Sequence, residues 1–271
     1  MNFGPLVEAG WLHDHIDDKD LRVIDFRWYL SGRSGRDEFL GGHIPGAVFL
    51  DLDKVTGTEG GGRHPMPPAE QFQREMRLRG VDPDTKVVVY DDTGGSTAAR
   101  LWFLLGYFGH RAQAVLDGGL QAWGVPLEDE VEVFAPGRFT AREADRSRVL
   151  DYDSVRNLRG VPLVDARAGE RYRGEKEPID PKAGHIPGAL SAPFSGNLGP
   201  DGRFKSPDEL RRRFEELGAQ DGAVFYCGSG VNATHDMLAM EVAGLPNARL
   251  YAGSWSDWSN RDAPVATGSE P

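Results

Sequence analysis

The sequence contains one cysteine, Cys227, among 271 residues. A single cysteine excludes an intramolecular disulfide and a cysteine metal cluster, so its value lies either in packing or in reactivity. No unbroken apolar run reaches about 18 residues, the length that a membrane-spanning helix requires. The N-terminus also lacks the basic and apolar stretches of a secretory signal, and we therefore expect a cytoplasmic protein.

Positive charge is scarce as well. The chain has 31 Lys and Arg residues against 42 Asp and Glu residues, a formal net charge of −11. Nucleic-acid-binding surfaces show the opposite balance, so we predict no nucleic-acid partner, and the lack of a membrane span predicts no membrane partner. The chain length suits two globular domains of ordinary size.

The chain repeats itself. Gly-His-Ile-Pro-Gly-Ala occurs at 42–47 and again at 184–189, roughly 140 residues later. Other matching segments follow in the same order: 23–27 with 163–167, Gly80 with Gly218, 88–91 with 224–227, and 120–123 with 255–258. A period of this length is too long for a solenoid, so each copy should be a domain with its own core.

The boundary between the copies falls between Trp123 and about Asp151. This stretch has no long apolar period and contains two prolines, as expected of a linker that lies across a surface. We predict a first domain at 1–140, with the linker starting at about residue 124, and a second domain at 148–271.

Within each copy, short β-rich runs alternate with helical patterns. The predicted strands are 23–26, 87–90, 112–116, 163–165 and 223–226. A helix at 206–217 is marked by Ser206 as N-cap, Pro207 in the first helical position and Glu209 in a capping box. This alternation predicts an α/β fold, in which each domain is a mainly parallel sheet flanked by helices.

Cys227 is expected on a turn between a strand and a helix. It ends the apolar run 223–226, and Gly-Ser-Gly-Val-Asn at 228–232 precedes the helical stretch 233–242. Ligands bind at this carboxyl end of parallel strands. The glycines allow backbone N–H groups to point at the sulfur, with the positive end of the helix behind them, which stabilises a thiolate or a persulfide anion.

The chain resembles the tandem-domain rhodaneses over essentially its whole length, a family that includes thiosulfate and 3-mercaptopyruvate sulfurtransferases. The resemblance rests on the duplicated layout, both Gly-His-Ile-Pro-Gly-Ala copies, the loop 227–231, Leu-Asp-Gly-Gly at 116–119 before Trp123, and Gly-Ser-Trp at 253–255 before Trp258. The family carries its active cysteine in the second copy only. Asp91 occupies the matching position in the first copy, which would make the first domain non-catalytic.

The resemblance implies a sulfurtransferase without a metal or other cofactor. The Cys227 thiolate would take sulfur from a small donor and pass it to cyanide or to a thiol, such as thioredoxin or glutathione. Binding of the charged sulfur and donor falls to Arg171, which matches the family's anion-binding arginine, and to the loop residues Gly228, Gly230, Val231 and Asn232. The family usually has threonine in place of Asn232, whose side chain is expected to cap the loop instead.

In mercaptopyruvate enzymes a serine, a histidine and an aspartate are thought to form a proton-handling triad. Ser229 lies two residues after the cysteine, as the family pattern requires. His64 and Asp53 fit the family's spacing after the first Gly-His-Ile-Pro-Gly-Ala and would reach in from the other domain. The resemblance therefore implies that Ser229, His64 and Asp53 are catalytic residues together with Cys227.

Two clues about the donor disagree. The neutral Gly228-Ser229 loop favours 3-mercaptopyruvate, because thiosulfate enzymes tend to carry basic residues there. Mercaptopyruvate enzymes, however, usually have a second arginine where this chain has Asp180. Compensation from Arg173, Lys176 or Lys182 is one interpretation, and thiosulfate:cyanide sulfurtransferase remains the alternative function.

Alternatives from other classes remain. The same persulfide could serve a non-catalytic sulfur carrier or a redox sensor. The G-x-G-x-x-A pattern at 228–233 lacks the later acidic residue of a dinucleotide site, and the loop lacks the arginine of a cysteine phosphatase. We interpret His43 and His185, which recur in both copies, as residues that hold loops together, and the Trp residues at 123, 255 and 258 as core.

Overall fold

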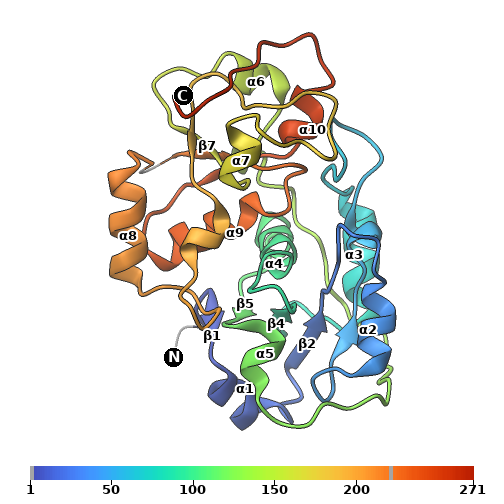
Figure 1. Cartoon of the computed structure of the whole chain (residues 1–271). Coiled ribbons are helices and arrows are strands. Elements are labelled where there is room, and N and C mark those ends of the chain that lie inside the picture. The colour runs from blue at the N-terminus through green and yellow to red at the C-terminus, as the bar shows by residue number, and fades with distance from the viewer. Residues whose placement is uncertain (1–2, 220–221) are drawn as a thin grey trace. The chain divides into compact units, whose positions relative to one another are not determined.

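The chain folds into two compact units in a computed structural model that describes residues 3–219 and 222–271 (Figure 1). The first unit comprises Met1–Thr56, Pro67–Asp145 and Pro200–Phe204, and the second comprises Gly57–Met66, Arg146–Gly199 and Lys205–Pro271. The short segment 57–66 lies within the predicted first domain and yet is grouped with the second unit. The domain bounds 1–140 and 148–271 stay predictions.

The first unit is built on a five-stranded parallel sheet with the strand order β1-β5-β4-β2-β3. Its strands are β1 (Leu6–Val7), β2 (Leu21–Asp25), β3 (Val48–Phe49), β4 (Lys86–Tyr90) and β5 (Gln113–Leu116). Its helices are α1 (Ala9–His15), α2 (Gly35–Gly41), η1 (Leu52–Val55), α3 (Ala69–Leu78), α4 (Ala98–Tyr107) and α5 (Gly119–Trp123). Because the central strands are almost fully buried, they form continuous apolar runs, such as Val-Val-Val in β4.

The second unit has the same architecture, with the strand order β6-β10-β9-β7-β8. Its strands are β6 (Val149–Leu150), β7 (Leu163–Asp165), β8 (Ala189–Ser191), β9 (Val224–Tyr226) and β10 (Arg249–Tyr251). Its helices are η2 (Arg146–Arg148), α6 (Tyr152–Arg156), α7 (Gly169–Tyr172), η3 (Phe194–Asn197), α8 (Pro207–Glu216), α9 (Ala233–Val242) and α10 (Ser254–Trp258). The two orders correspond strand by strand, so the sequence repeat is a repeat of the fold, and the predicted fold class is confirmed.

Within the described residues, no helix combines the length and the apolarity needed to cross a bilayer.

Several local predictions are confirmed. Helix α8 begins at Pro207, and Ser206 and Glu209 form the predicted capping box. Helix α9 spans the predicted residues 233–242. Strands β1, β3, β6, β8 and β10, with two or three residues each, were not predicted, because segments so short show no alternation. The equally short β7 and β9 were predicted from their apolar runs.

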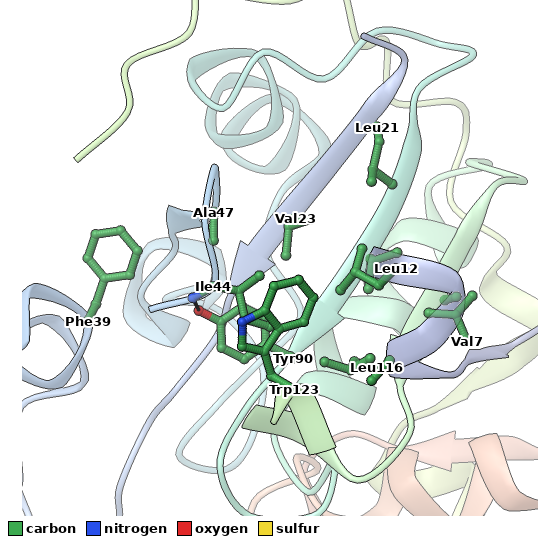
Figure 2. Packing of buried hydrophobic residues seen from close by; sticks show 13 residues of the cluster. Val7, Leu12, Leu21, Val23, Phe39, Ile44, Ala47, Tyr90, Leu116 and Trp123 are labelled. Atoms are coloured by element: carbon green, nitrogen blue, oxygen red, sulfur yellow. Dashed lines mark hydrogen bonds between the residues drawn. The ribbon is translucent and has the colours of Figure 1, made fainter. Parts of the chain in front are cut away.

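Each sheet is covered by an apolar cluster that includes the predicted core tryptophans. In the first unit Trp123 packs with Tyr90, Ile44 and Leu12, and Figure 2 shows side chains from strands and helices meeting in this cluster. In the second unit Trp255 and Trp258 belong to the corresponding cluster. All three tryptophans are at least 96% buried, which confirms their assignment to the core.

The two histidines that recur in the repeat hold loops, as predicted. His43 Nδ1 donates a hydrogen bond to the carbonyl oxygen of Phe39 at 2.8 Å, and its ring stacks on that residue. His185 has the same relation to Tyr172, with an Nδ1–O distance of 2.8 Å. Each backbone also pairs with a distant segment, His43 with Glu128 and His185 with Ala266. The two Gly-His-Ile-Pro-Gly-Ala copies are therefore structural.

One buried carboxyl in the second unit makes stability depend on pH. Asp236, on α9, is fully buried, and its Oδ1 accepts a hydrogen bond from Asn197 Nδ2 at 2.5 Å. Burial raises the pKa of Asp236 to about 7, against the opposing effects of Asn197 and Arg213. Because the folded state holds this proton more tightly than the unfolded state does, stability falls as pH rises from about 4 through 7.

We expect Asp236→Asn to remove this pH dependence. Between about pH 5 and 7 the wild type should lose about 2 kcal/mol more of its free energy of unfolding than the variant loses. Urea unfolding of both proteins across that range measures the difference. Since every other titrating group is shared, parallel pH profiles would contradict the assignment.

Candidate functional site

Cys227 lies at the carboxyl end of β9, between the strand and α9. Its side chain is 2% exposed. The backbone N–H of Gly230 donates to Cys227 Sγ across 3.2 Å. A backbone N–H aimed at sulfur, in a loop that opens a helix, is suited to a thiolate or a persulfide anion. The predicted position on a strand-to-helix turn is confirmed, and the catalytic role of Cys227 stays a prediction.

The loop needs glycine at 230. Its backbone has φ +80°, in the left-handed region, and a Cβ there would lie 2.6 Å from the carbonyl oxygen of Ala252. Any side chain would therefore displace the N–H that reaches Cys227. Val231 is buried and accepts hydrogen bonds from Thr234 through its carbonyl oxygen. Asn232 is the N-cap residue of α9, where its side chain makes no capping hydrogen bond to the described residues of that helix, and its role in the cysteine loop stays a prediction.

Residues at the start of α10 form hydrogen bonds with the cysteine loop. Ser254 Oγ accepts a hydrogen bond from the Cys227 N–H at 3.2 Å. The N–H groups of Trp255 and Ser256 donate to the carbonyl oxygens of Cys227 and Gly228, each at 2.9 Å. Sequence reasoning identified 253–255 only as a family motif and missed this supporting role.

His64 contacts Ser229 within the second unit. The Nδ1 of His64 lies 2.8 Å from Ser229 Oγ, and the two side chains are 7% and 9% exposed. The segment 57–66 that carries His64 is fixed by a hydrogen bond of 3.0 Å from the Arg63 N–H to Ser256 Oγ. A buried His–Ser pair can relay a proton to or from a group bound in front of the serine.

Two glycines allow the segment 57–66 to pack closely against the start of α10. A Cβ on Gly61 would overlap the Asp257 carboxylate, and a Cβ on Gly62 would overlap the carbonyl oxygen of Gly253. The glycine-rich stretch therefore lies directly on the start of α10 and delivers His64. Asp53 lies in η1 of the first unit, with an exposed side chain, and its role in a triad stays a prediction.

Arg171, on α7, points its guanidinium toward the cysteine loop. Its Nη2 donates to Glu177 Oε1 at 2.7 Å and to Asp180 Oδ2 at 3.3 Å. Its Nη1 lies 3.4 Å from the position that a Cβ on Gly228 would occupy. Arg171 is thus beside the residue that follows Cys227, where a donor's anionic end would bind.

A second guanidinium, which sequence reasoning missed, comes from Arg63. Its Nη2 lies 2.9 Å from the same Cβ position of Gly228, and its Nη1 forms an ion pair with Asp180. Two of the three candidates named for compensation are engaged otherwise: Arg173 with Glu175, and Lys182 with the carbonyl oxygen of Arg261. Direct adjacency to His64 was the sequence signal that could have identified Arg63.

The two carboxylates of this cluster respond differently to burial. Burial opposes ionisation of Glu177, but hydrogen bonds from Arg171 and from the backbone N–H groups of Asp180 and Ile179 lower its pKa. Burial raises the pKa of Asp180, and the neighbouring Arg63 only partly offsets this effect. A pocket of about 450 Å³ opens beside Arg63 and Asp180. Among the described residues, no group of three or more His, Cys, Asp or Glu side chains could hold a metal ion.

In the first unit, Asp91 fills the loop that corresponds to the cysteine loop. The carboxylate is fully buried and accepts five hydrogen bonds of 2.8–3.0 Å. Four come from backbone N–H groups and one from a hydroxyl; the donors are Thr93 N, Gly95 N, Thr97 N, Ala98 N and Thr97 Oγ1. The backbone N–H groups of this loop therefore form an anion-binding nest, and the Asp91 carboxylate occupies it.

Comparison with known proteins extends these observations. The Rhodanese-like domain family matches the chain twice, at residues 8–125 and 151–261. A Pseudomonas aeruginosa protein named "Probable 3-mercaptopyruvate sulfurtransferase" is 43% identical, over 99% of this chain and 100% of its own. A Mycobacterium tuberculosis protein, SseB, provisionally named a thiosulfate sulfurtransferase, is 38% identical over 97% of each chain.

The fold comparison agrees with the sequence comparison. The crystal structure of SseA from Escherichia coli, presented as a 3-mercaptopyruvate sulfotransferase with the rhodanese fold, superposes with a TM-score of 0.82. The two chains are 33% identical, and the match covers 93% of this chain and 99% of the other. Both rhodanese-like copies are therefore present along the chain.

Proposed function

The chain belongs to the rhodanese-like domain family and is a sulfurtransferase, and we propose that it moves a sulfane sulfur from 3-mercaptopyruvate, through a persulfide on Cys227, to a thiol or to cyanide. The observation that carries the proposal is the Gly230 N–H directed at Cys227 Sγ, in a loop that has His64 bound to Ser229. The Cys227 loop, which suits a charged sulfur atom, thus lies next to a His–Ser pair that can transfer a proton.

The first half-reaction forms the persulfide. The Cys227 thiolate attacks the sulfur of the donor, an S–S bond forms and the C–S bond breaks, so that the electron pair goes to the donor carbon. That carbon takes a proton, which the Ser229–His64 pair supplies, and pyruvate leaves. Asp53 is proposed to orient His64. Arg171 holds the donor carboxylate during the attack, and Gly228, Gly230, Val231 and Asn232 surround the charged sulfur.

The second half-reaction returns the enzyme to its starting state. An acceptor thiolate attacks the outer sulfur, the S–S bond of the persulfide breaks and Cys227 recovers its thiolate. Thioredoxin and glutathione are the proposed thiol acceptors, and cyanide gives thiocyanate in the same way. A lone thiol that must stay reduced fits the cytoplasm, which is the location we propose.

Thiosulfate is the alternative donor, favoured by the provisional name of SseB. Side-by-side steady-state assays of sulfur transfer to cyanide decide between the donors. We expect a higher kcat/KM with 3-mercaptopyruvate. A higher kcat/KM with thiosulfate would overturn the choice of donor, and inactivity with both would favour the carrier or redox-sensor function.

The His64–Ser229 contact predicts a donor-specific loss of activity. Because pyruvate formation requires a proton at carbon and sulfite release does not, we expect His64→Ala to lower kcat by ~10²-fold with 3-mercaptopyruvate and much less with thiosulfate. Ser229→Ala should show the same donor bias. Equal losses with both donors would mean that His64 only supports the loop.

A further inference from the structure

We propose that Arg63 is the second guanidinium that binds the donor's carboxylate, with Asp180 as the residue that positions it. The inference rests on the proposed function, since it names how this site holds its donor. It also resolves the departure at position 180, where an arginine was expected and an aspartate stands.

The guanidiniums of Arg63 and Arg171 converge beside Gly228. The Cβ position of Gly228 lies 2.9 Å from Arg63 Nη2 and 3.4 Å from Arg171 Nη1. These side chains come from segments far apart in the sequence, and both approach the residue next to Cys227. Two planar donors that face the same side of a loop form a clamp for a carboxylate.

Arg63 has more hydrogen-bond donors than its ion pair with Asp180 uses. Its Nη1 is bound to Asp180, and its backbone N–H is bound to Ser256 Oγ at 3.0 Å. Its buried Nε has no hydrogen-bond partner among residues 3–219 and 222–271. Guanidinium nitrogens seldom stay unpaired when buried, so a bound anion would satisfy a group that is otherwise left without an acceptor.

The charges around the two guanidiniums are balanced. Arg63 and Arg171 face Glu177 and Asp180, whose side chains are each 3% exposed, so two positive charges meet two negative ones. A balanced cluster suits a donor with one carboxylate better than the thiosulfate dianion.

Asp180 has a positioning role in this arrangement. It binds Arg63 on one side and Arg171 on the other, and therefore fixes the distance between the two guanidiniums. We expect the Arg63–Asp180 pair to tolerate an exchange of its two charges. An arginine at position 180 could reach the same space if an aspartate at position 63 became its partner.

The test uses the full chain with Arg63→Gln and Arg212→Gln, the latter as a matched control on the exposed face of α8. Arg63→Gln should raise KM for 3-mercaptopyruvate by ~10–100-fold and leave kcat within about threefold. Arg212→Gln should change neither constant. An unchanged KM in Arg63→Gln would overturn the inference.

Two further measurements separate this inference from the proposed function. Titration of pyruvate into the Cys227→Ser protein, with and without Arg63→Gln, reads carboxylate binding without turnover, and we expect a ~10–100-fold weaker Kd in the double variant. If wild-type protein transfers no sulfur while this weakening is seen, the clamp stands and the proposed function fails. Equal pyruvate affinities would overturn the clamp even in an active enzyme.

Charge inversion gives the sharpest outcome. Arg63→Asp alone should lose more affinity for 3-mercaptopyruvate than Arg63→Gln loses, because it adds a repelling carboxylate. Combining Arg63→Asp with Asp180→Arg should recover KM to within about tenfold of wild type. Failure of the pair to recover, in a protein with unchanged thermal stability, would contradict an anion-binding role for Arg63.

Discussion

Replacing Cys227 with serine is expected to abolish sulfur transfer from any donor, by at least ~10⁴-fold, while the fold stays intact. Serine is similar in size, and its Oγ can accept the same hydrogen bond from the Gly230 N–H that Sγ accepts at 3.2 Å. Oxygen, however, cannot form a persulfide. Steady-state assays with both donors, combined with circular dichroism and thermal unfolding, measure the two parts of this expectation. Turnover retained with either donor would contradict the mechanism.

Replacing Asp91 with alanine is expected to lower the free energy of unfolding of the first unit by about 3–5 kcal/mol. The carboxylate is fully buried and accepts four backbone N–H groups and one hydroxyl, so its removal leaves several buried donors without partners. Urea unfolding measures the loss, with Asp84→Ala, at an exposed position, as the control. A loss under about 1 kcal/mol would mean that water replaces the carboxylate.

These two variants probe the same loop in its two forms. In one copy the nest holds a carboxylate supplied by the chain, and in the other it surrounds a cysteine that can carry a charged sulfur. We therefore expect Asp91→Ala to lower stability, and Cys227→Ser to lower activity at nearly unchanged stability. This contrast between lost stability and lost activity would distinguish the copy whose loop is structural from the copy that we propose to be catalytic.

Much of the fold followed from the repeat and from the alternation of strands and helices. Helices α8 and α9 were predictable because Ser206, Pro207 and Glu209 mark one start, and a glycine-rich turn marks the other. Strands β1, β3, β6, β8 and β10 were not, because two or three residues carry no periodicity. The equally short β7 and β9 were predicted from their apolar runs. The assignment of 57–66 to the second unit depends on tertiary packing of glycines, which local patterns do not encode.

The site was predictable where a motif placed residues next to one another. The position of Cys227 and its loop follows from strand, glycine and helix signals, and Ser229 was named from the family resemblance, which places a serine two residues after the cysteine. Arg63 was missed because its position depends on an ion pair with Asp180, more than a hundred residues away in the sequence. Pairing between distant charged residues becomes visible only when the chain is folded.

The most direct test of the persulfide mechanism is mass spectrometry of the protein after incubation with 3-mercaptopyruvate in the absence of an acceptor. The account predicts that the peptide containing Cys227 gains the mass of one sulfur atom, that cyanide removes this mass as thiocyanate, and that Cys227→Ser gains nothing. Release of pyruvate without added sulfur on the Cys227 peptide would contradict it.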